Sequence, residues 1–328
     1  MILMSPKLLL VVPCYNEQEI LHQSNQKLNT YFDQLLEQNK IASESKICYI
    51  NDGSKDATWT LIDQLTKSNP RVLGIKLAKN FGHQNAVLAG LFSFIDQYDC
   101  YISIDADLQD DINAIGEMVS KYEEGSSVVY GVREDRSTDT FFKKFTAELF
   151  YKIMDKLGVP VVFNHADFRL IDNKVLKEFA NFKEYNMFIR GIIPTIGFPS
   201  DKVYYKRLER EAGESKYPFS KMLAFAWKGI TSFSTVPMRM VLWFGIINFI
   251  ISVIIGLFVL SSKLRGVAVS GWTSIVLPMA FFSGSNMIAI GLIGEYIGKI
   301  YEEVKGRPRY IIEKITGVDS PHNPNSGQ

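Results

Sequence analysis

The stretch Tyr101–Asp111, YISIDADLQDD, changes within a few residues from an apolar run to a cluster of acidic side chains. Residues Cys100–Ile104 carry no charge and are rich in β-branched and aromatic side chains, which predicts a buried β-strand. In α/β proteins, ligands bind at the carboxyl ends of strands, where this acidic cluster would lie. The stretch therefore predicts an α/β fold with a ligand site at the end of this strand.

The acidic cluster itself suggests the kind of ligand. Carboxylates this close together repel one another unless a cation neutralises them. Carboxylate, amide and water oxygens are the ligands that Mg²⁺ and Mn²⁺ prefer, and Mg²⁺ commonly bridges carboxylates to substrate phosphates. We therefore predict a divalent-metal site for a nucleotide diphosphate. The alternative is an acidic loop in which Asp110 or Asp111 caps a helix that begins near Ile112.

Strand-like and helix-like segments alternate on both sides of this stretch. The other predicted strands are Lys7–Val12, Ile47–Ile50, Val72–Leu77 and Ser127–Tyr130. The helical patterns between them cover Ile20–Leu36, Trp59–Leu65 and Ala86–Ile95. Such alternation predicts a mostly parallel sheet with right-handed crossovers.

Three polar loops follow predicted strands, at Tyr15–Glu17, Asp52–Gly53 and Asp105–Gln109. In a doubly wound sheet such loops meet at one edge, so we expect them to form one site. Asp52 would then accept hydrogen bonds from a base or a ribose. The alternatives are that Asp52 only stabilises its turn and that Glu17 only favours the first turn of a helix.

The composition limits the classes of function. A net charge of +1 argues against a general nucleic-acid binder. The three cysteines have no disulfide or zinc spacing, which favours a reducing compartment.

Apolar residues are concentrated beyond Met238. We divide the chain into a catalytic domain (1–217), amphipathic interfacial helices (218–238), a transmembrane hairpin (239–298) and a C-terminal segment (299–328) whose end, from Thr316, is expected to be disordered. The runs Met240–Ser262 and Gly271–Gly294 are uncharged and long enough to span a bilayer. The two flanks of the hairpin together carry more basic residues than its connector, and this bias predicts a multi-pass protein of the cell membrane with both ends cytoplasmic. The flanking residues are Arg239, Lys299, Lys305, Arg307 and Arg309, and those of the connector are Lys263 and Arg265.

The motifs carry a family resemblance when taken together. VPCYNE at Val12–Glu17, NDGSKD at Asn51–Asp56, DADLQ at Asp105–Gln109 and GESK at Gly213–Lys216 stand in order before the apolar runs. The chain thus resembles the family 2 glycosyltransferases of the GT-A fold, and among them the polyprenyl-phosphate glycosyltransferases. The resemblance extends from about Leu8 to Arg309.

The resemblance implies a role for each matching residue. The implied donor-binding residues are Pro13, Tyr15, Glu17, Asp52, Asp105, Ala106, Arg210 and Lys216. Asp107 and Gln109 would bind Mg²⁺ or Mn²⁺, and the implied catalytic residues are Asp105, Asp107, Arg133 and Asp167. Arg133, Ser137 and Arg169 would bind the acceptor phosphate. Asp167 and Arg169 belong to a polar stretch, Asn164–Arg169, in which Asp167 would orient the acceptor or act as a base.

The resemblance also implies the reaction. It is the inverting transfer of one hexose, glucose or N-acetylglucosamine, from a UDP-sugar to undecaprenyl phosphate for modification of cell-envelope glycans. None of the four tryptophans follows an arginine, so the Gln-x-x-Arg-Trp motif of the processive synthases is missing. The alternatives are a GDP-mannose donor, another membrane lipid as the acceptor, and a binding protein without turnover. A homo-oligomer, such as a tetramer, is also implied, with glycines of the apolar runs available for helix packing.

Overall fold

The computed structural model describes residues 5–134, 165–184, 187, 189–206, 236–265 and 273–318. The chain forms two compact units. The first unit comprises Met1–Lys152, Pro160–Lys216 and Pro308–Gln328, and the second comprises Ile153–Val159 and Tyr217–Arg307. The described strands all lie in the first unit, and two long helices lie in the second.

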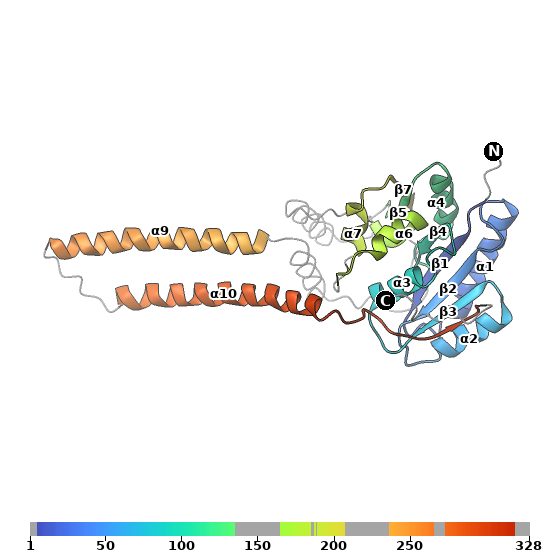
Figure 1. The fold of residues 1–328 in the computed structure, drawn as a ribbon, viewed down its shortest axis with the longest axis horizontal. Helices are drawn as coiled ribbons and strands as arrows, with labels where there is room; N and C mark the ends of the chain where they lie inside the picture. The colour runs from blue at the N-terminus through green and yellow to red at the C-terminus, as the bar shows by residue number, and fades with distance from the viewer. Residues whose placement is uncertain are drawn as a thin grey trace. The chain divides into compact units, whose positions relative to one another are not determined.

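The first unit is built on a sheet of eight strands in the order β7-β5-β6-β4-β1-β2-β3-β8 (Figure 1). The strands are β1 (Leu8–Cys14), β2 (Lys46–Asn51), β3 (Val72–Leu77), β4 (Cys100–Ser103), β5 (Val128–Arg133), β6 (His165–Asp172), β7 (Ser200–Tyr205) and β8 (Ile312–Thr316). Strands β1 to β4 are parallel, and β5 is parallel to β7. Strand β6 is antiparallel to both neighbours, and β8 is antiparallel to β3. The predicted α/β fold with a mostly parallel sheet is confirmed.

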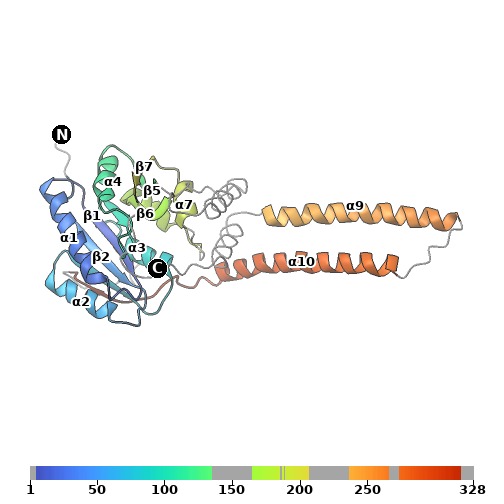
Figure 2. The same ribbon diagram turned by 180° about the vertical axis from the view of Figure 1, so that it is seen from behind.

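Helices cover both faces of this sheet. They are α1 (Leu21–Glu37), α2 (Thr58–Ser68), α3 (His83–Phe92), α4 (Ala114–Glu123), α6 (Asn173–Ala180) and α7 (Ile189–Thr195). Helices α1, α2 and α4 lie on one face, and α3 and α6 lie on the other (Figures 1 and 2). Central strand β1 is buried along its whole length, which explains its unbroken apolar run. Leu10 of this strand shares one hydrophobic cluster with Phe32 of α1 and Ile115 of α4.

Two antiparallel strands were not anticipated. The polar stretch Asn164–Arg169 enters strand β6, which lies between β4 and β5. Its polarity obscured the strand, because Asp167 and Arg169 pair with each other inside the protein. The second strand is β8, in a segment that the sequence assigns to a separate C-terminal region. It pairs with β3 in the register Ile75↔Ile315.

The C-terminal segment is therefore part of the first unit from Pro308 onward. Arg309 anchors it by donating hydrogen bonds to the backbone carbonyls of Phe182 and Glu184, at 2.6 and 3.0 Å. Disorder from Thr316 is wrong for its first residue, which ends strand β8. The end of the chain, residues 319–328, lies outside the described residues.

The second unit contains helices α9 (Val236–Leu264) and α10 (Thr273–Val304), which pack against each other. Large apolar side chains are exposed on both helices, as shown by Trp243 at 63% and Ile288 at 73% exposure. We find no helix among the described residues that is both long enough and apolar enough to cross a membrane, so the predicted two transmembrane helices are not supported. The predicted interfacial segment 218–238 lies almost wholly outside the described residues.

The glycines of α10 do not mediate its packing against α9. A Cβ atom added at Gly284, Gly291 or Gly294 would meet no described atom within 4 Å. Within the described part of the chain, these three glycine positions therefore make no close contact with α9.

Candidate functional site

The carboxyl ends of β1, β2 and β4 enclose a cleft of about 280 Å³. We call it the acidic cleft, and it is lined by Pro13, Cys14, Tyr15, Glu17, Asp52, Asn80, Gly82, His83, Ala86, Asp105, Ala106 and Asp107. The three predicted polar loops therefore meet at one edge of the sheet, as expected for a doubly wound fold. Every described residue that we predicted to bind the donor lines this cleft.

Hydrogen bonds join the first two loops directly. The Asn16 backbone N–H donates to Ser54 Oγ at 3.0 Å, and the Lys55 N–H donates to Asn16 Oδ1 at 2.9 Å. Asn16 adopts a positive φ of 57°, which an asparagine tolerates better than most residues. These contacts fix the loop that carries Tyr15 and Glu17 against the loop that follows β2.

Asp52 holds in place the residues before α3, some of which also line the cleft. Its side chain is buried, and its two oxygens accept hydrogen bonds from the Phe81 and Gly82 amides at 2.7 and 3.0 Å. Burial raises the pKa of Asp52 above its usual value, although these two amides oppose the shift. Gly82 has a φ of +91°, a conformation that favours glycine. Asp52 thus sets the start of α3, which begins at His83 rather than near the predicted Ala86.

The acidic loop after β4 presents two carboxylates to the cleft. Asp105 and Asp107 both line it, and Asp107 Oδ1 accepts a 3.3 Å hydrogen bond from the Gln109 backbone. Burial raises the pKa of Asp105; the nearby His83 opposes the rise, while Asp167, Asp110 and Asp107 add to it. This repulsion is what a bound cation would relieve.

The predicted metal ligands are placed differently from each other. Asp107 lines the cleft, whereas Gln109 is 6% exposed and does not line it. Among the described residues, no group of three or more His, Cys, Asp or Glu side chains is arranged to hold a metal ion. Asp105 and Asp107 still suit Mg²⁺ or Mn²⁺ chemically, since such ions take one or two carboxylates and complete their shell from water and phosphates.

Arg133 is held by a cluster that the sequence did not reveal. Its Nε and Nη2 donate to Oδ1 of the buried Asp110 at 3.2 and 3.0 Å, and Tyr205 Oη donates to the same oxygen at 2.7 Å. Burial works against the charge of Arg133, but Asp110 and Tyr205 outweigh it and raise its pKa. Asp110 is therefore a partner of Arg133, and the alternative that Asp110 caps helix α4 is wrong.

Asp167 lies between two arginines, and we call Asp167, Arg169 and Arg190 the arginine clamp. Arg169 Nη2 donates to Asp167 Oδ1 at 2.5 Å, while Arg190 Nε and Nη2 donate to the two carboxylate oxygens at 3.0 and 2.9 Å. Burial would raise the pKa of Asp167, but Arg190 and Arg169 hold it well below its usual range. A carboxylate with so low a pKa is a weak base, so the structure favours the orienting role over the base.

Arg169 and Arg190 differ in exposure. The Arg169 side chain is 2% exposed, which argues against the predicted contact with an acceptor phosphate. The Arg190 side chain is 28% exposed. Sequence reasoning missed Arg190, and the available signal was a single arginine within the apolar helix α7.

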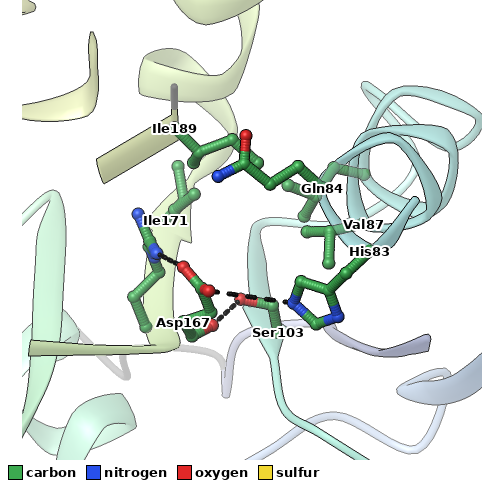
Figure 3. Close-up of a pocket in the computed structure, with 9 residues that line it drawn as sticks. His83, Gln84, Val87, Ser103, Asp167, Ile171 and Ile189 are labelled. Carbon is green, nitrogen blue, oxygen red and sulfur yellow. Dashed lines mark hydrogen bonds and ion pairs between the residues drawn. The ribbon is translucent and has the colours of Figure 1, made fainter. Parts of the chain in front are cut away.

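His83 links the acidic cleft to the arginine clamp. Its Nε2 lies 3.7 Å from Asp105 Oδ1 and 3.8 Å from Asp167 Oδ2. Figure 3 shows the imidazole directed towards Asp167 across Ser103, whose Oγ donates to the Asp167 backbone carbonyl at 2.6 Å. His83 lines both the acidic cleft and a small pocket beside the clamp, so it borders both parts of the site.

Three predicted site residues, Ser137, Arg210 and Lys216, lie outside the described residues. They follow β5 and β7 in the chain, and these parallel strands end side by side in the register Arg133↔Tyr205. Their roles stay predictions.

Comparisons with known proteins add to this geometry. The sequence profile described as "Glycosyl transferase family 2" matches residues 9–180. The chain is 49% identical over 308 residues to the "Uncharacterized glycosyltransferase YkoT" of Bacillus subtilis, covering 94% of this chain and 91% of that protein. It is 39% identical over 312 residues to the "Prophage bactoprenol glucosyl transferase homolog" of Escherichia coli, covering 94% and 99%. Among solved structures, glucosyl-3-phosphoglycerate synthase from Mycobacterium tuberculosis matches with 13% identity and a TM-score of 0.43, over 70% of this chain and 79% of that one.

Proposed function

The chain belongs to glycosyl transferase family 2 and is a glycosyltransferase, and from this premise we propose that it transfers one glucose from a UDP-sugar to polyprenyl phosphate. The observation that carries the proposal is the 39% identity, over 94% of the chain, to a protein named a bactoprenol glucosyl transferase homolog. The product would be a polyprenyl-phosphate sugar used to modify glycans of the cell envelope.

The donor would bind in the acidic cleft. Tyr15, Glu17, Asp52, Asp105 and Ala106 all line the cleft. We propose that the first three hold the nucleotide and that Asp105 and Ala106 contact its sugar. The volume of about 280 Å³ approaches the lower limit for small-molecule sites. Arg210 and Lys216 are proposed to reach the phosphates, because arginine and lysine bind them well.

A divalent cation would be held by Asp107, with Asp105 beside it and Gln109 as the further predicted ligand. When bound, Mg²⁺ or Mn²⁺ would supply charge neutralisation for the departing diphosphate. Asp105 and Asp107 would orient that cation at the end of β4. Arg133, fixed by Asp110 and Tyr205, would present a positive charge at a constant position near the acidic loop.

The acceptor needs no strong base in this reaction. A phosphate monoester has its second pKa near ~6, so its oxygen is ionised at neutral pH. The two arginines of the clamp lower the pKa of Asp167, so this carboxylate is a poor proton acceptor. An ionised phosphate needs no proton removed before it attacks, so the low pKa is consistent with a phosphate acceptor. A lipid hydroxyl would require a working base, so the clamp favours the phosphate.

Helices α9 and α10 are proposed to bring the enzyme to the membrane that holds its lipid. Their exposed apolar side chains, such as Phe249 at 69% and Met287 at 66%, support burial in lipid or against other subunits. We propose attachment to the cell membrane with a cytoplasmic catalytic unit, where nucleotide sugars are made, and a homo-oligomer through the same helices.

One experiment tests the proposal. The full chain, purified in detergent, is incubated with radiolabelled UDP-glucose, UDP-N-acetylglucosamine or GDP-mannose, with and without undecaprenyl phosphate, in Mg²⁺, Mn²⁺ or EDTA. We expect labelled lipid only with a UDP-sugar, the phosphate acceptor and a metal. Donor binding without any labelled lipid would contradict the proposal. Labelled lipid from GDP-mannose alone would show that the donor is GDP-mannose and not a UDP-sugar.

A further inference from the structure

We propose that His83 and Arg190 bind the ionised phosphate of the acceptor at the border of the acidic cleft. This inference rests on the proposed function, because it assumes an acceptor that carries a phosphate monoester. The two residues come from separate helices of the first unit, since His83 begins α3 and Arg190 lies in α7.

The position of His83 is the first step. Its Nε2 lies 3.7 Å from Asp105, which lines the acidic cleft, and 3.8 Å from Asp167 in the arginine clamp. Its side chain is 44% exposed and is the only histidine, lysine or arginine that lines the cleft among the described residues. An anion that contacts this imidazole therefore lies beside Asp105, the carboxylate predicted to contact the donor sugar.

The position of Arg190 is the second step. Its guanidinium holds both oxygens of Asp167, the same carboxylate that His83 approaches. The His83 imidazole from α3 and the Arg190 guanidinium from α7 therefore both lie near Asp167 Oδ2. Because the Arg190 side chain is 28% exposed, an entering ligand can reach it without unfolding the helix.

The charge of the clamp is the third step. Two guanidinium groups, of Arg169 and Arg190, converge on the single carboxylate of Asp167. A phosphate monoester brings negative charge to these groups, and arginine binds phosphate in a fixed geometry. The acidic cleft without a metal has the opposite sign, which separates the sites of the acceptor phosphate and the metal.

The other arginines fit this role less well. Arg169 is 2% exposed, and Arg133 has its charge balanced by Asp110 at 3.0 Å. Arg133 can still contact a phosphate from its own cluster. Arg169 and Arg190 both pair with Asp167, the carboxylate that His83 approaches, but of these two arginines Arg190 is the more exposed.

The reaction then balances without a proton transfer. One phosphate oxygen of the acceptor forms a bond to the anomeric carbon, while the bond from that carbon to the diphosphate oxygen breaks. The diphosphate leaves with the electron pair. Since the attacking oxygen is already ionised, His83 and Arg190 act by placing it, and placement alone is worth a large part of such barriers.

The test uses the full chain in detergent with His83→Gln and Arg190→Lys. Kinetics are measured with a water-soluble short-chain prenyl phosphate as the acceptor, and its binding without donor is measured by calorimetry. We expect each variant to raise the acceptor KM and Kd by about tenfold, the size of one lost hydrogen bond to a charged group, with the donor KM within about twofold of wild type. The matching prenyl alcohol should bind neither wild type nor variants measurably.

Two variants serve as controls. His22→Gln changes an exposed histidine of α1, and Arg71→Lys changes an arginine that pairs with Asp33 away from the cleft. Both should leave every parameter unchanged. Thermal unfolding checks that Arg190→Lys and His83→Gln are folded. His83→Gln is the safer variant because the His83 side chain is 44% exposed and that of Arg190 is 28% exposed.

Three outcomes would overturn the inference. They are an unchanged acceptor KM and Kd in both variants, an equal rise in the donor KM, and binding of the prenyl alcohol as tight as that of the phosphate. A wild-type enzyme that transfers no sugar to any prenyl phosphate overturns the proposed function instead, and the inference falls with it.

Discussion

The acidic cleft and the arginine clamp treat their carboxylates in opposite ways. In the cleft, Asp105 and Asp107 both belong to a lining in which His83 is the only basic residue among those described. In the clamp, Asp167 is neutralised twice over within the chain. The pKa of Asp105 is accordingly raised, chiefly by burial, and that of Asp167 is lowered by its arginines against burial. The comparison shows that the carboxylate of the clamp is neutralised by side chains of the chain itself, whereas the carboxylates of the cleft would be neutralised by a bound cation.

The largest expected effect breaks the cleft at Asp107. We predict that Asp107→Ala lowers the transfer rate by about 10³-fold or more, because a metal at the leaving group is worth several kcal/mol. The rate is measured with saturating donor and acceptor in Mg²⁺ and in Mn²⁺. Asp111→Ala is the control, since Asp111 belongs to the same loop but does not line the cleft. Near-normal turnover of Asp107→Ala would show that Asp107 does not hold a metal that the reaction needs.

The second effect breaks the clamp. Asp167→Asn leaves Arg169 and Arg190 without their shared negative partner in a buried setting, which we expect to cost about 3 kcal/mol of unfolding free energy. Chemical denaturation of the full chain measures it. Asp33→Asn, which removes the exposed pair with Arg71, should cost less than ~0.5 kcal/mol. Equal losses in the two variants would mean that the clamp adds nothing beyond a surface pair.

The clamp also predicts a dependence on acid. The folded pKa of Asp167 lies below that of the unfolded chain, which is about 3.9 for aspartate. The ionised carboxylate therefore stabilises the fold above about pH 4, and this contribution is lost as the pH falls towards the folded pKa. Asp167→Asn should accordingly flatten the loss of stability below pH 4.

The acidic cleft was more accessible to sequence reasoning than the clamp. Its residues stand in short loops directly after apolar strands, so strand prediction alone brings Glu17, Asp52 and Asp105 to one edge of the sheet. The clamp combines strand β6 with helix α7, and no local pattern indicates which arginine meets Asp167. Long-range pairing decides this, as it does for Asp110 with Tyr205 and for β8 with β3.

A smaller effect sharpens the comparison at Arg133. Tyr205→Phe removes the 2.7 Å hydrogen bond to Asp110 Oδ1 and the 3.4 Å contact with Arg133 Nε, but keeps the ring that packs on Phe168. We expect a loss of about 1 kcal/mol of stability and less than a tenfold fall in kcat/KM. Tyr204→Phe is the matched control, because the neighbouring Tyr204 is 56% exposed. Identical behaviour of the two variants would show that Tyr205 does not hold Arg133.

The smallest expected effect concerns Asp105, and it tests whether ionisation of this carboxylate destabilises the fold. Its folded pKa is raised, so ionisation disfavours the fold, and stability falls as the pH rises from about 3.9 through the folded pKa. We predict that Asp105→Asn is more stable than wild type at pH 7 without metal, by about 0.5 kcal/mol, a small value because the side chain is 46% exposed and screened by water. Saturating Mg²⁺ should stabilise wild type more than the variant, since a cation relieves the repulsion only where both carboxylates are present. A variant less stable than wild type at pH 7 would mean that His83 already neutralises Asp105, and that the cleft resembles the clamp in being complete without a cation.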